Sequence, residues 1–279
     1  MSNKPEFKFA ASITAEPLAQ AAPILFRGDP ASSIAKAKTI GYDAVEIHLR
    51  DPQKLDREAL FKACEENEIS VAALATGPEV SLNGFSMLDP SPDRRKELMK
   101  NLVAHVDLAS ELKALVIMGM LRGQLGENPD KDKALFEAQL LELADYAKEK
   151  GVTLVLEAIN FYVNNYLCST IDTCDYIRSL GKGNILLHID THHMNIEDYD
   201  PVDSTHYAGE TVGYVHVCEI NRMYPGAGRF DFPGILKALA ETGYVGYLSL
   251  ECLPLPDPIT AATLGLAYIK KEVNALGGI

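Results

Sequence analysis

The chain has 279 residues, of which 47% are hydrophobic and 23% charged, a composition that is typical of a globular protein and argues against disorder. Its apolar runs reach about seven residues, which excludes a membrane span of about 20, and its N-terminus lacks the pattern of a secretory signal. The net charge of −13 without a basic cluster disfavours a nucleic-acid partner, and five cysteines without a CxxC spacing indicate reduced thiols in a cytoplasmic protein.

Short apolar runs alternate along the chain with longer segments of helical periodicity. We interpret eight of the apolar runs as strands, at residues 7–13, 44–49, 70–76, 114–120, 153–159, 185–190, 213–219 and 247–251. Helical patterns lie between them, for example at residues 56–68, 91–112, 132–151 and 231–243. The last two of these end on glycine, as many helices do.

This alternation of eight strands with helices predicts an α/β fold, a single (β/α)₈ TIM barrel that spans residues 1–279 as one domain. An open doubly wound sheet is the structural alternative. Such a sheet usually has fewer strands and often carries a GxGxxG turn after the first strand, and no such turn follows residues 7–13.

Acidic and imidazole side chains stand at the ends of the last four predicted strands. They are Glu157, Asp190, His216 and Glu251. The carboxyl ends of barrel strands form the active site, so these side chains are expected to converge at one mouth. Each alone has a simpler interpretation as a solvated or core polar residue, but three carboxylates in one pocket repel each other unless a cation binds between them. The pattern therefore predicts a metal site for Mn²⁺, Mg²⁺ or Co²⁺.

Other polar residues lie near the same mouth. His193 follows Asp190 by three residues, and we expect it to contact the substrate or to support the metal ligands. Arg222, in the loop after residues 213–219, has a guanidinium fork that suits neighbouring substrate oxygens. Gly226 and Gly228 in that loop allow either a close approach to a ligand or a tight turn.

At these residues the chain resembles the xylose-isomerase-like barrel superfamily of sugar isomerases and epimerases, and most of all the ketose 3-epimerases of the tagatose and psicose (allulose) group. The motifs that carry the resemblance are LEAIN, DTHHMNIED, HVCEINRMYPGAGRFDF and GYVGYLSLE. The resemblance implies that the four strand-end residues bind one divalent ion, Mn²⁺ first, with Co²⁺, Mg²⁺ and Zn²⁺ as alternatives. It also implies that Glu157 and Glu251 transfer protons, and that His193 and Arg222 hold oxygens near the substrate carbonyl.

The chain departs from these epimerases in two respects. They usually show Asn-Arg-Phe-Glu after the glutamate of the fifth barrel strand, and the last acid contacts the substrate. Here the sequence is Asn-Phe-Tyr-Val, so that Val163 replaces the acid. The epimerases also often have aromatic walls that include tryptophan, and this chain contains none. The metal chemistry is therefore better supported than the identity of the sugar, and a modified sugar, a glycoside or a keto-acid stays open.

The expected reaction is proton abstraction next to a carbonyl, through an enediolate that the metal stabilises as a Lewis acid. Epimerisation of a ketose or keto-sugar derivative is the first hypothesis. An aldose–ketose or hydroxypyruvate-type isomerase and a metal-dependent lyase on a keto-sugar stay open as alternatives, because they begin with the same step. An apurinic-endonuclease-like hydrolase and a non-catalytic metal-binding barrel are less favoured. The expected partner is a small sugar, without nucleic acid or membrane, and a homo-oligomer, dimer or tetramer, is left open.

Overall fold

The computed structural model describes residues 6–277, in which parallel strands form one closed sheet. The strands are β1 (Lys8–Thr14), β2 (Phe26–Arg27), β3 (Ala44–His48), β4 (Ser70–Ala75), β5 (Leu115–Met118), β6 (Leu154–Glu157), β7 (Ile185–Asp190), β8 (Val212–His216) and β9 (Tyr247–Leu250). Each pairs with its neighbour in the order β2-β1-β3-β4-β5-β6-β7-β8-β9, and β9 pairs with β1. The barrel is therefore closed by eight strands, with the short β2 added beside β1.

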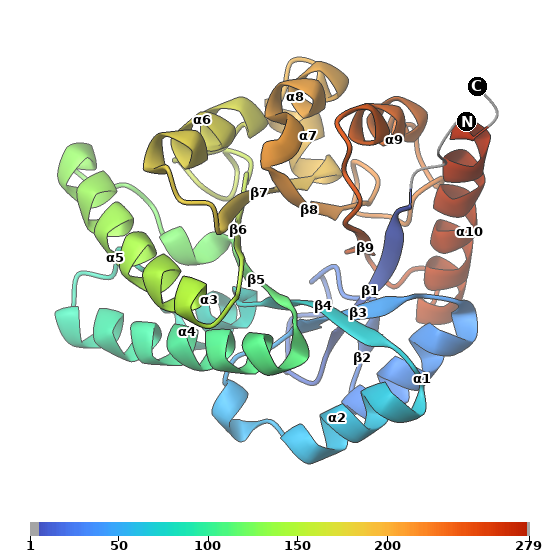
Figure 1. Ribbon diagram of the computed structural model, residues 1–279, viewed down its shortest axis with the longest axis horizontal. Coiled ribbons are helices and arrows are strands. Elements are labelled where there is room, and N and C mark those ends of the chain that lie inside the picture. Colours follow the sequence, from blue (N-terminus) through green and yellow to red (C-terminus); the bar gives the residue numbers. More distant parts are fainter. Residues whose placement is uncertain (1–5, 278–279) are drawn as a thin grey trace.

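The helices surround the barrel (Figure 1). They are α1 (Pro30–Ile40), α2 (Arg57–Glu66), α3 (Gly77–Asn83), α4 (Pro92–Leu112), α5 (Pro129–Glu149), α6 (Thr170–Leu180), α7 (Thr191–Glu197), α8 (Pro201–Ala208), α9 (Phe232–Glu241) and α10 (Pro258–Leu276). Short 3₁₀ turns lie at Pro52–Lys54, Met120–Arg122 and Gly209–Thr211. None of the helices between residues 6 and 277 has the length and apolar character that crossing a membrane requires.

The fold confirms the prediction of a TIM barrel, and each of the eight predicted strands overlaps one observed strand; β1 and β8 extend one residue beyond their predicted ranges, to Thr14 and from Val212. The short strand β2 was not predicted from the sequence; its two residues pair with Ile13 and Thr14 at the end of β1. The predicted strand at 114–120 is shorter in the structure, because the chain leaves the sheet at Gly119 and turns at Met120–Arg122.

Local sequence signals explain where most helices begin and end. Five helices start at a proline that directly follows a capping residue, and each cap accepts a hydrogen bond from a backbone N–H two or three residues later; the caps are Asp29, Ser91, Asn128, Asp200 and Asp257. Gly151 and Gly243, which the sequence marks as helix ends, have φ values of 70° and 79° just after α5 and α9.

The inside of the barrel is lined by small side chains, which leave room for buried polar groups. The apolar cluster there consists largely of alanines, at positions 10, 44, 72, 73 and 75. Above and between them lie side chains that carry charge or hydrogen-bonding groups and are at most 1% exposed: Glu46, His188, Asp190 and His216. A second and larger apolar core packs the strands against the helices. The barrel therefore holds a polar centre inside an apolar shell.

Candidate active site

The four residues that the sequence predicts as metal ligands come together at the carboxyl ends of the strands. Glu157, Asp190 and His216 are the last residues of β6, β7 and β8, and Glu251 directly follows β9. Asp190 and His216 are register partners on neighbouring strands. The side chains are largely buried, with 13% of Glu251 exposed and none of Asp190. The predicted convergence is confirmed, and the role of these residues as ligands stays a prediction.

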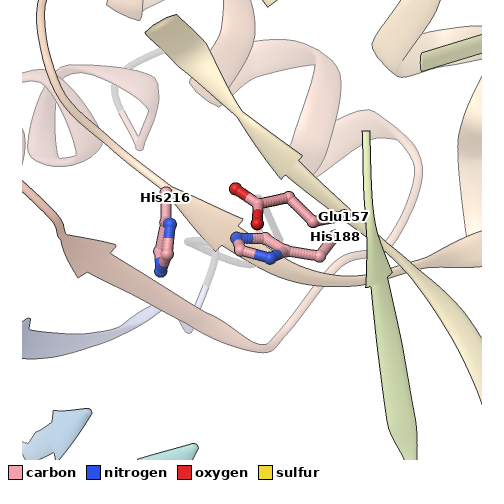
Figure 2. A group of neighbouring side chains, drawn as sticks. All are labelled: Glu157, His188 and His216. Atoms are coloured by element: carbon pink, nitrogen blue, oxygen red, sulfur yellow. The ribbon is translucent and has the colours of Figure 1, made fainter. Parts of the chain in front are cut away.

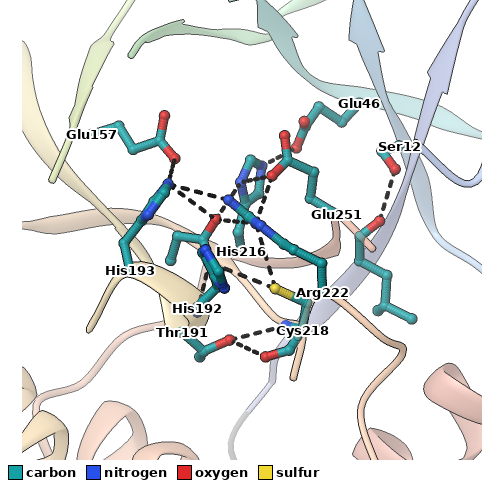
Figure 3. A network of polar contacts seen from close by, with 12 residues as sticks. Ser12, Glu46, Glu157, Thr191, His192, His193, His216, Cys218, Arg222 and Glu251 are labelled. Carbon is teal, nitrogen blue, oxygen red and sulfur yellow. Dashed lines mark hydrogen bonds and ion pairs between the residues drawn. The ribbon is translucent and has the colours of Figure 1, made fainter. Parts of the chain in front are cut away.

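Arg222 reaches into this cluster from the loop after β8. Its Nη1 lies 2.5 Å from Oδ2 of Asp190. The same atom lies 2.9 Å from Oε2 of Glu251 (Figure 3). Nδ1 of His216 lies 3.7 Å and 3.4 Å from the same two oxygens. A positive group thus bridges two carboxylates that would otherwise repel each other, so the site accommodates a cation between them.

His193, on α7, stands beside the same carboxylates. Its Nε2 is 3.7 Å from Oε1 of Glu157, 3.9 Å from Oδ2 of Asp190 and 3.1 Å from Nη2 of Arg222. The side-chain amide of Asn160 contacts the other ring nitrogen at 2.7 Å and holds the ring in this direction. Burial lowers the pKa of His193 to about 3, so the ring is neutral at pH 7. The structure therefore places both predicted substrate-binding residues, His193 and Arg222, at the predicted metal site.

The three carboxyl groups differ in their protonation. Burial raises the pKa of Glu157 to about 8, and the charges of Glu251 and Asp190 act in the same direction. Burial also opposes the ionisation of Asp190 and Glu251, but the charges of Arg222 and His216 outweigh it and lower both pKa values. The protein's own charges thus stabilise two carboxylates at neutral pH and leave the third protonated. A divalent ion would allow all three to ionise.

His216 offers the clearest sign that the site fits a metal. Its Nε2 bonds to Oε2 of Glu46 at 2.7 Å, whereas its Nδ1 is buried without a hydrogen-bond partner among the residues that the structure describes. Buried ring nitrogens are rarely left without a partner. This one faces the oxygens of Asp190 and Glu251, and a set of imidazole nitrogen and carboxylate oxygens suits Mn²⁺, Co²⁺ or Zn²⁺.

Two residues that the sequence analysis did not single out hold Glu157 in place. The carboxylate lies against Gly119, where a Cβ atom would collide with it. Arg122 is 1% exposed and donates hydrogen bonds to the backbone oxygens of Glu157 at 2.5 Å and Leu167 at 3.1 Å. Burial lowers its pKa to about 10, so it remains a cation at neutral pH. Arg122 therefore ties the end of β6 to the loop that follows it.

His188 lies beneath the site on β7. Its ring centroid is 4.1 Å from that of His216, with the two planes at 90°, and it lies beside Glu157 (Figure 2). Neither ring nitrogen has a hydrogen-bond partner within residues 6–277. Burial keeps the pKa of His188 well below its usual value, so the ring is neutral. Its contact with the His216 ring agrees with two roles. His188 either supports the proposed ligands or packs inside the barrel.

The two glycines after β8 shape the loop rather than approach the recess. A Cβ at Gly228 would collide with the side chain of Glu219, and one at Gly226 with the ring of Tyr268. Glu219 is 1% exposed and accepts hydrogen bonds from the backbone N–H of Gly226 and of Phe230. Of the two roles that the sequence allowed for these glycines, the structure thus supports the tight turn.

A recess of about 170 Å³ opens next to the cluster. Glu157, His216 and Glu251 form one side of it. Most of its remaining wall is apolar and comes from the segments that follow β1, β4 and β5, with Leu18, Pro23, Ile24, Pro78 and Met120 among the lining residues. His48 and Ser81 add polar side chains. A substrate in the recess would therefore meet the carboxylates at one end and largely apolar surface at the other.

Val163, which replaces the acid of the resembling epimerases, lies outside this recess. Its side chain is 40% exposed, and its backbone oxygen accepts a hydrogen bond from Gln124. The neighbouring rings of Phe161 and Tyr162 are 57% and 77% exposed. The loop after β6 thus presents an apolar surface where an acid would have stood.

Comparison with known proteins agrees with the observed barrel fold. A family model described as xylose isomerase-like TIM barrel matches residues 34–272. An L-ribulose 3-epimerase from Methylomonas sp. (strain DH-1) is 31% identical over 239 residues, which cover 83% of this chain and 82% of the relative. An L-ribulose 3-epimerase from Mesorhizobium japonicum is 33% identical over 227 residues, 78% of this chain and 74% of the relative.

A solved structure shares the architecture. The D-allulose 3-epimerase from Methylomonas sp., in complex with D-allulose, superposes with a TM-score of 0.81 at 25% identity. The match covers 96% of this chain and 98% of that one.

Proposed function

The chain belongs to the xylose isomerase-like TIM barrel family, and we propose that it is a metal-dependent epimerase or isomerase of a ketose or keto-sugar derivative. The observation that carries this proposal is the cluster beside the recess of three buried carboxyl groups and an imidazole nitrogen that has no hydrogen-bond partner within residues 6–277. The names of the relatives, ketose 3-epimerases among them, support the same reaction class.

We further propose that Glu157, Asp190, His216 and Glu251 hold one divalent ion, with Mn²⁺ as the first candidate. When bound, such an ion supplies Lewis-acid polarisation of a carbonyl oxygen. The arrangement of Arg222 supports the proposal, since its guanidinium already bridges Asp190 and Glu251 as a cation would.

Glu157 and Glu251 are proposed to move the protons. Their strands are three apart among the eight of the closed barrel, about 135° around its axis, and both side chains line the recess. One carboxylate removes the proton from the carbon next to the carbonyl, and the electron pair of the C–H bond passes into the enediolate. The other, in its acid form, returns a proton to that carbon on the opposite face, which inverts the centre.

His193 and Arg222 are proposed to hold the substrate oxygens. The neutral ring of His193 and the charged fork of Arg222 lie 3.1 Å apart and face the carboxylates. A developing negative charge on a substrate oxygen there would be stabilised by the guanidinium. In this role Arg222 positions the carbonyl while the two glutamates act on the adjacent carbon.

Three further properties are part of the proposal: location, partners and assembly. A cytoplasmic protein is supported by its free cysteines, five in the described chain. The charge of −13 supports the absence of a nucleic-acid partner. Exposed apolar side chains on the loops after β6 and β8, among them Phe161, Tyr162 and Ile220, support a homo-oligomer, dimer or tetramer.

The test is incubation of the protein with Mn²⁺ in D₂O against a panel of ketoses, aldoses and keto-sugars. NMR would identify the carbon that gains deuterium and the product that forms. Deuterium at a carbon next to the carbonyl, together with an epimer or an isomer of the substrate, is expected. A panel in which no substrate exchanges hydrogen would contradict the proposed reaction class.

A further inference from the structure

Glu46 is a buried carboxylate in β3 that the proposed mechanism does not use. It has no exposed surface and receives hydrogen bonds from three side chains. Its Oε1 bonds to Nε2 of His48 at 2.7 Å, and its Oε2 bonds to Nε2 of His216 at 2.7 Å and to the hydroxyl of Tyr214 at 2.9 Å. A buried carboxylate is costly without such partners, so this set of donors is what stabilises Glu46 as an anion.

The bond to Glu46 determines which nitrogen of His216 carries the proton. An ionised carboxylate only accepts, so Nε2 of His216 must donate. A metal ligand must be a neutral ring, and with Nε2 protonated its lone pair is on Nδ1, the atom that has no partner in the described structure and lies 3.4 Å from Glu251 and 3.7 Å from Asp190. Glu46 is on β3 and His216 on β8, so the closure of the barrel brings together two residues that are 170 positions apart.

The same carboxylate holds a second imidazole at the wall of the recess. Nε2 of His48 donates to Oε1 of Glu46 and lies 3.7 Å from Oε1 of Glu251, and the residue lines the recess. Each oxygen of Glu46 thus accepts a hydrogen bond from one imidazole ring. The ring of His216 lies on the side of the proposed metal, and the ring of His48 lies on the side of the recess.

We propose that Glu46 is a positioning residue: it keeps the proton of His216 on Nε2 and thereby directs the Nδ1 lone pair toward the metal. This inference rests on the metal site proposed above. Carboxylates that accept from the second nitrogen of a metal-bound histidine fix the ring and raise its basicity, and their removal typically weakens metal binding about 10- to 100-fold.

Two variants separate this role from general support of the fold. Glu46→Gln keeps the shape but removes the negative charge and one of the two accepting oxygens, so Nε2 of His216 meets a weaker acceptor or an amide N–H. Tyr214→Phe removes the third donor and leaves both imidazole bonds intact. We expect the Mn²⁺ dissociation constant, measured by competition with a fluorescent chelator, to rise about 10- to 100-fold in Glu46→Gln and less than about threefold in Tyr214→Phe. Circular dichroism would check that both variants are folded.

A measurement on the unaltered protein tests the inference even if Glu46→Gln fails to fold. With Zn²⁺ bound, which is diamagnetic, ¹⁵N NMR of the histidine rings should show the proton of His216 on Nε2 and the metal on Nδ1. The reverse assignment would overturn the proposal, as would equal losses of Mn²⁺ affinity in the two variants or an unchanged affinity in Glu46→Gln. If the unaltered protein bound no divalent ion at all, the metal site itself would be wrong, and the role of Glu46 with it.

Discussion

Asp190 and His216 are register partners, and each is the last residue of its strand. The pairing of β7 with β8 therefore sets an acid and an imidazole side by side at the mouth of the barrel, before any loop contributes. Glu157 on the other neighbour of β7 pairs with His188, two residues earlier in that strand. The stagger between strands thus spreads the acidic groups around one point instead of stacking them in a row.

Removing a ligand should remove the metal. We expect protein purified without chelator to contain about one divalent ion per chain, and Asp190→Asn and His216→Ala to lose most of it, because each replaces one of four converging donors. Elemental analysis measures this. His206→Ala is the matched control, since that histidine is on α8 with 42% of its side chain exposed. Unaltered metal content in both site variants would refute the ligand assignment.

Metal affinity should rise with pH. Burial holds the pKa of Glu157 at about 8, and the charges of Glu46 and Glu251 raise the pKa of His216 well above its usual value although burial opposes them. The metal-free protein therefore carries protons on both groups at neutral pH, and binding must release them. Affinity is expected to increase until the pH exceeds both pKa values. Calorimetry in buffers of different ionisation enthalpy would measure the release, and binding without proton release would contradict these protonation states.

Free ketoses should be poor substrates. The wall of the recess is largely apolar, and the loop after β6 outside it carries Val163 in place of an acid, so one substrate hydroxyl would stay unpaired, at a cost of about 1–3 kcal/mol. We expect low kcat/KM for tagatose, fructose and psicose, and a higher value for a sugar modified at that end. The inference would be wrong if one of these ketoses reacted as well as with a ketose 3-epimerase assayed beside it.

Position 163 lies outside the recess, so an acid restored there acts only on a substrate that extends from the recess to the loop after β6. Val163→Glu is expected to raise kcat/KM for a free ketose about 5- to 100-fold, the equivalent of one recovered hydrogen bond. Val245→Glu is the control, because this valine is 67% exposed on the turn between α9 and β9, at the opposite end of the strands. An equal effect of the two substitutions would indicate a general effect of charge.

Arg122 should be more important for stability than an exposed arginine with similar bonds. Arg122→Lys cannot bridge the carbonyls of Glu157 and Leu167 together, so the free energy of unfolding should fall by about 1–3 kcal/mol. Arg178 also donates to two backbone carbonyls, but its side chain is 44% exposed, and Arg178→Lys should cost less than about 0.5 kcal/mol. Urea denaturation compares them. Equal losses would show that Arg122 has no special role at the end of β6.

The sequence predicts those features that repeat locally. Apolar runs, capping residues and strand-end acids recur at a spacing that defines the barrel and its mouth, so Glu157, Asp190, His216 and Glu251 can be identified before the structure is known. Glu46 could not be assigned a role in this way, because its partner His216 is 170 residues away and meets it only when the barrel closes.

The sequence nevertheless contains a signal for some of the residues that were not predicted. Glu46 and His48 are two apart in a predicted strand and therefore share one face, which is unusual for a buried strand. Arg122 follows a predicted strand within a short turn, but nothing in its neighbours shows that the turn is covered by the loop after β6. The direction of a loop depends on contacts between distant segments, and a single sequence does not contain them.

The central claim is that Glu157 and Glu251 act on opposite faces of one enediolate. Glu→Gln keeps the shape and one oxygen of each residue while it removes the base, and each variant should lose turnover about 10²- to 10⁴-fold. Both variants replace a proposed ligand, so they are assayed in excess Mn²⁺, and elemental analysis first establishes that each has metal bound under these conditions.

The decisive measurement is hydrogen exchange by these two variants in D₂O, followed by NMR on both epimers of the substrate. We expect an asymmetry: Glu157→Gln should still introduce deuterium into one epimer, and Glu251→Gln into the other, because each keeps the carboxylate that serves one face. If both metal-replete variants exchanged the same epimer, a single base would be at work, and the protein would be an isomerase or a lyase instead.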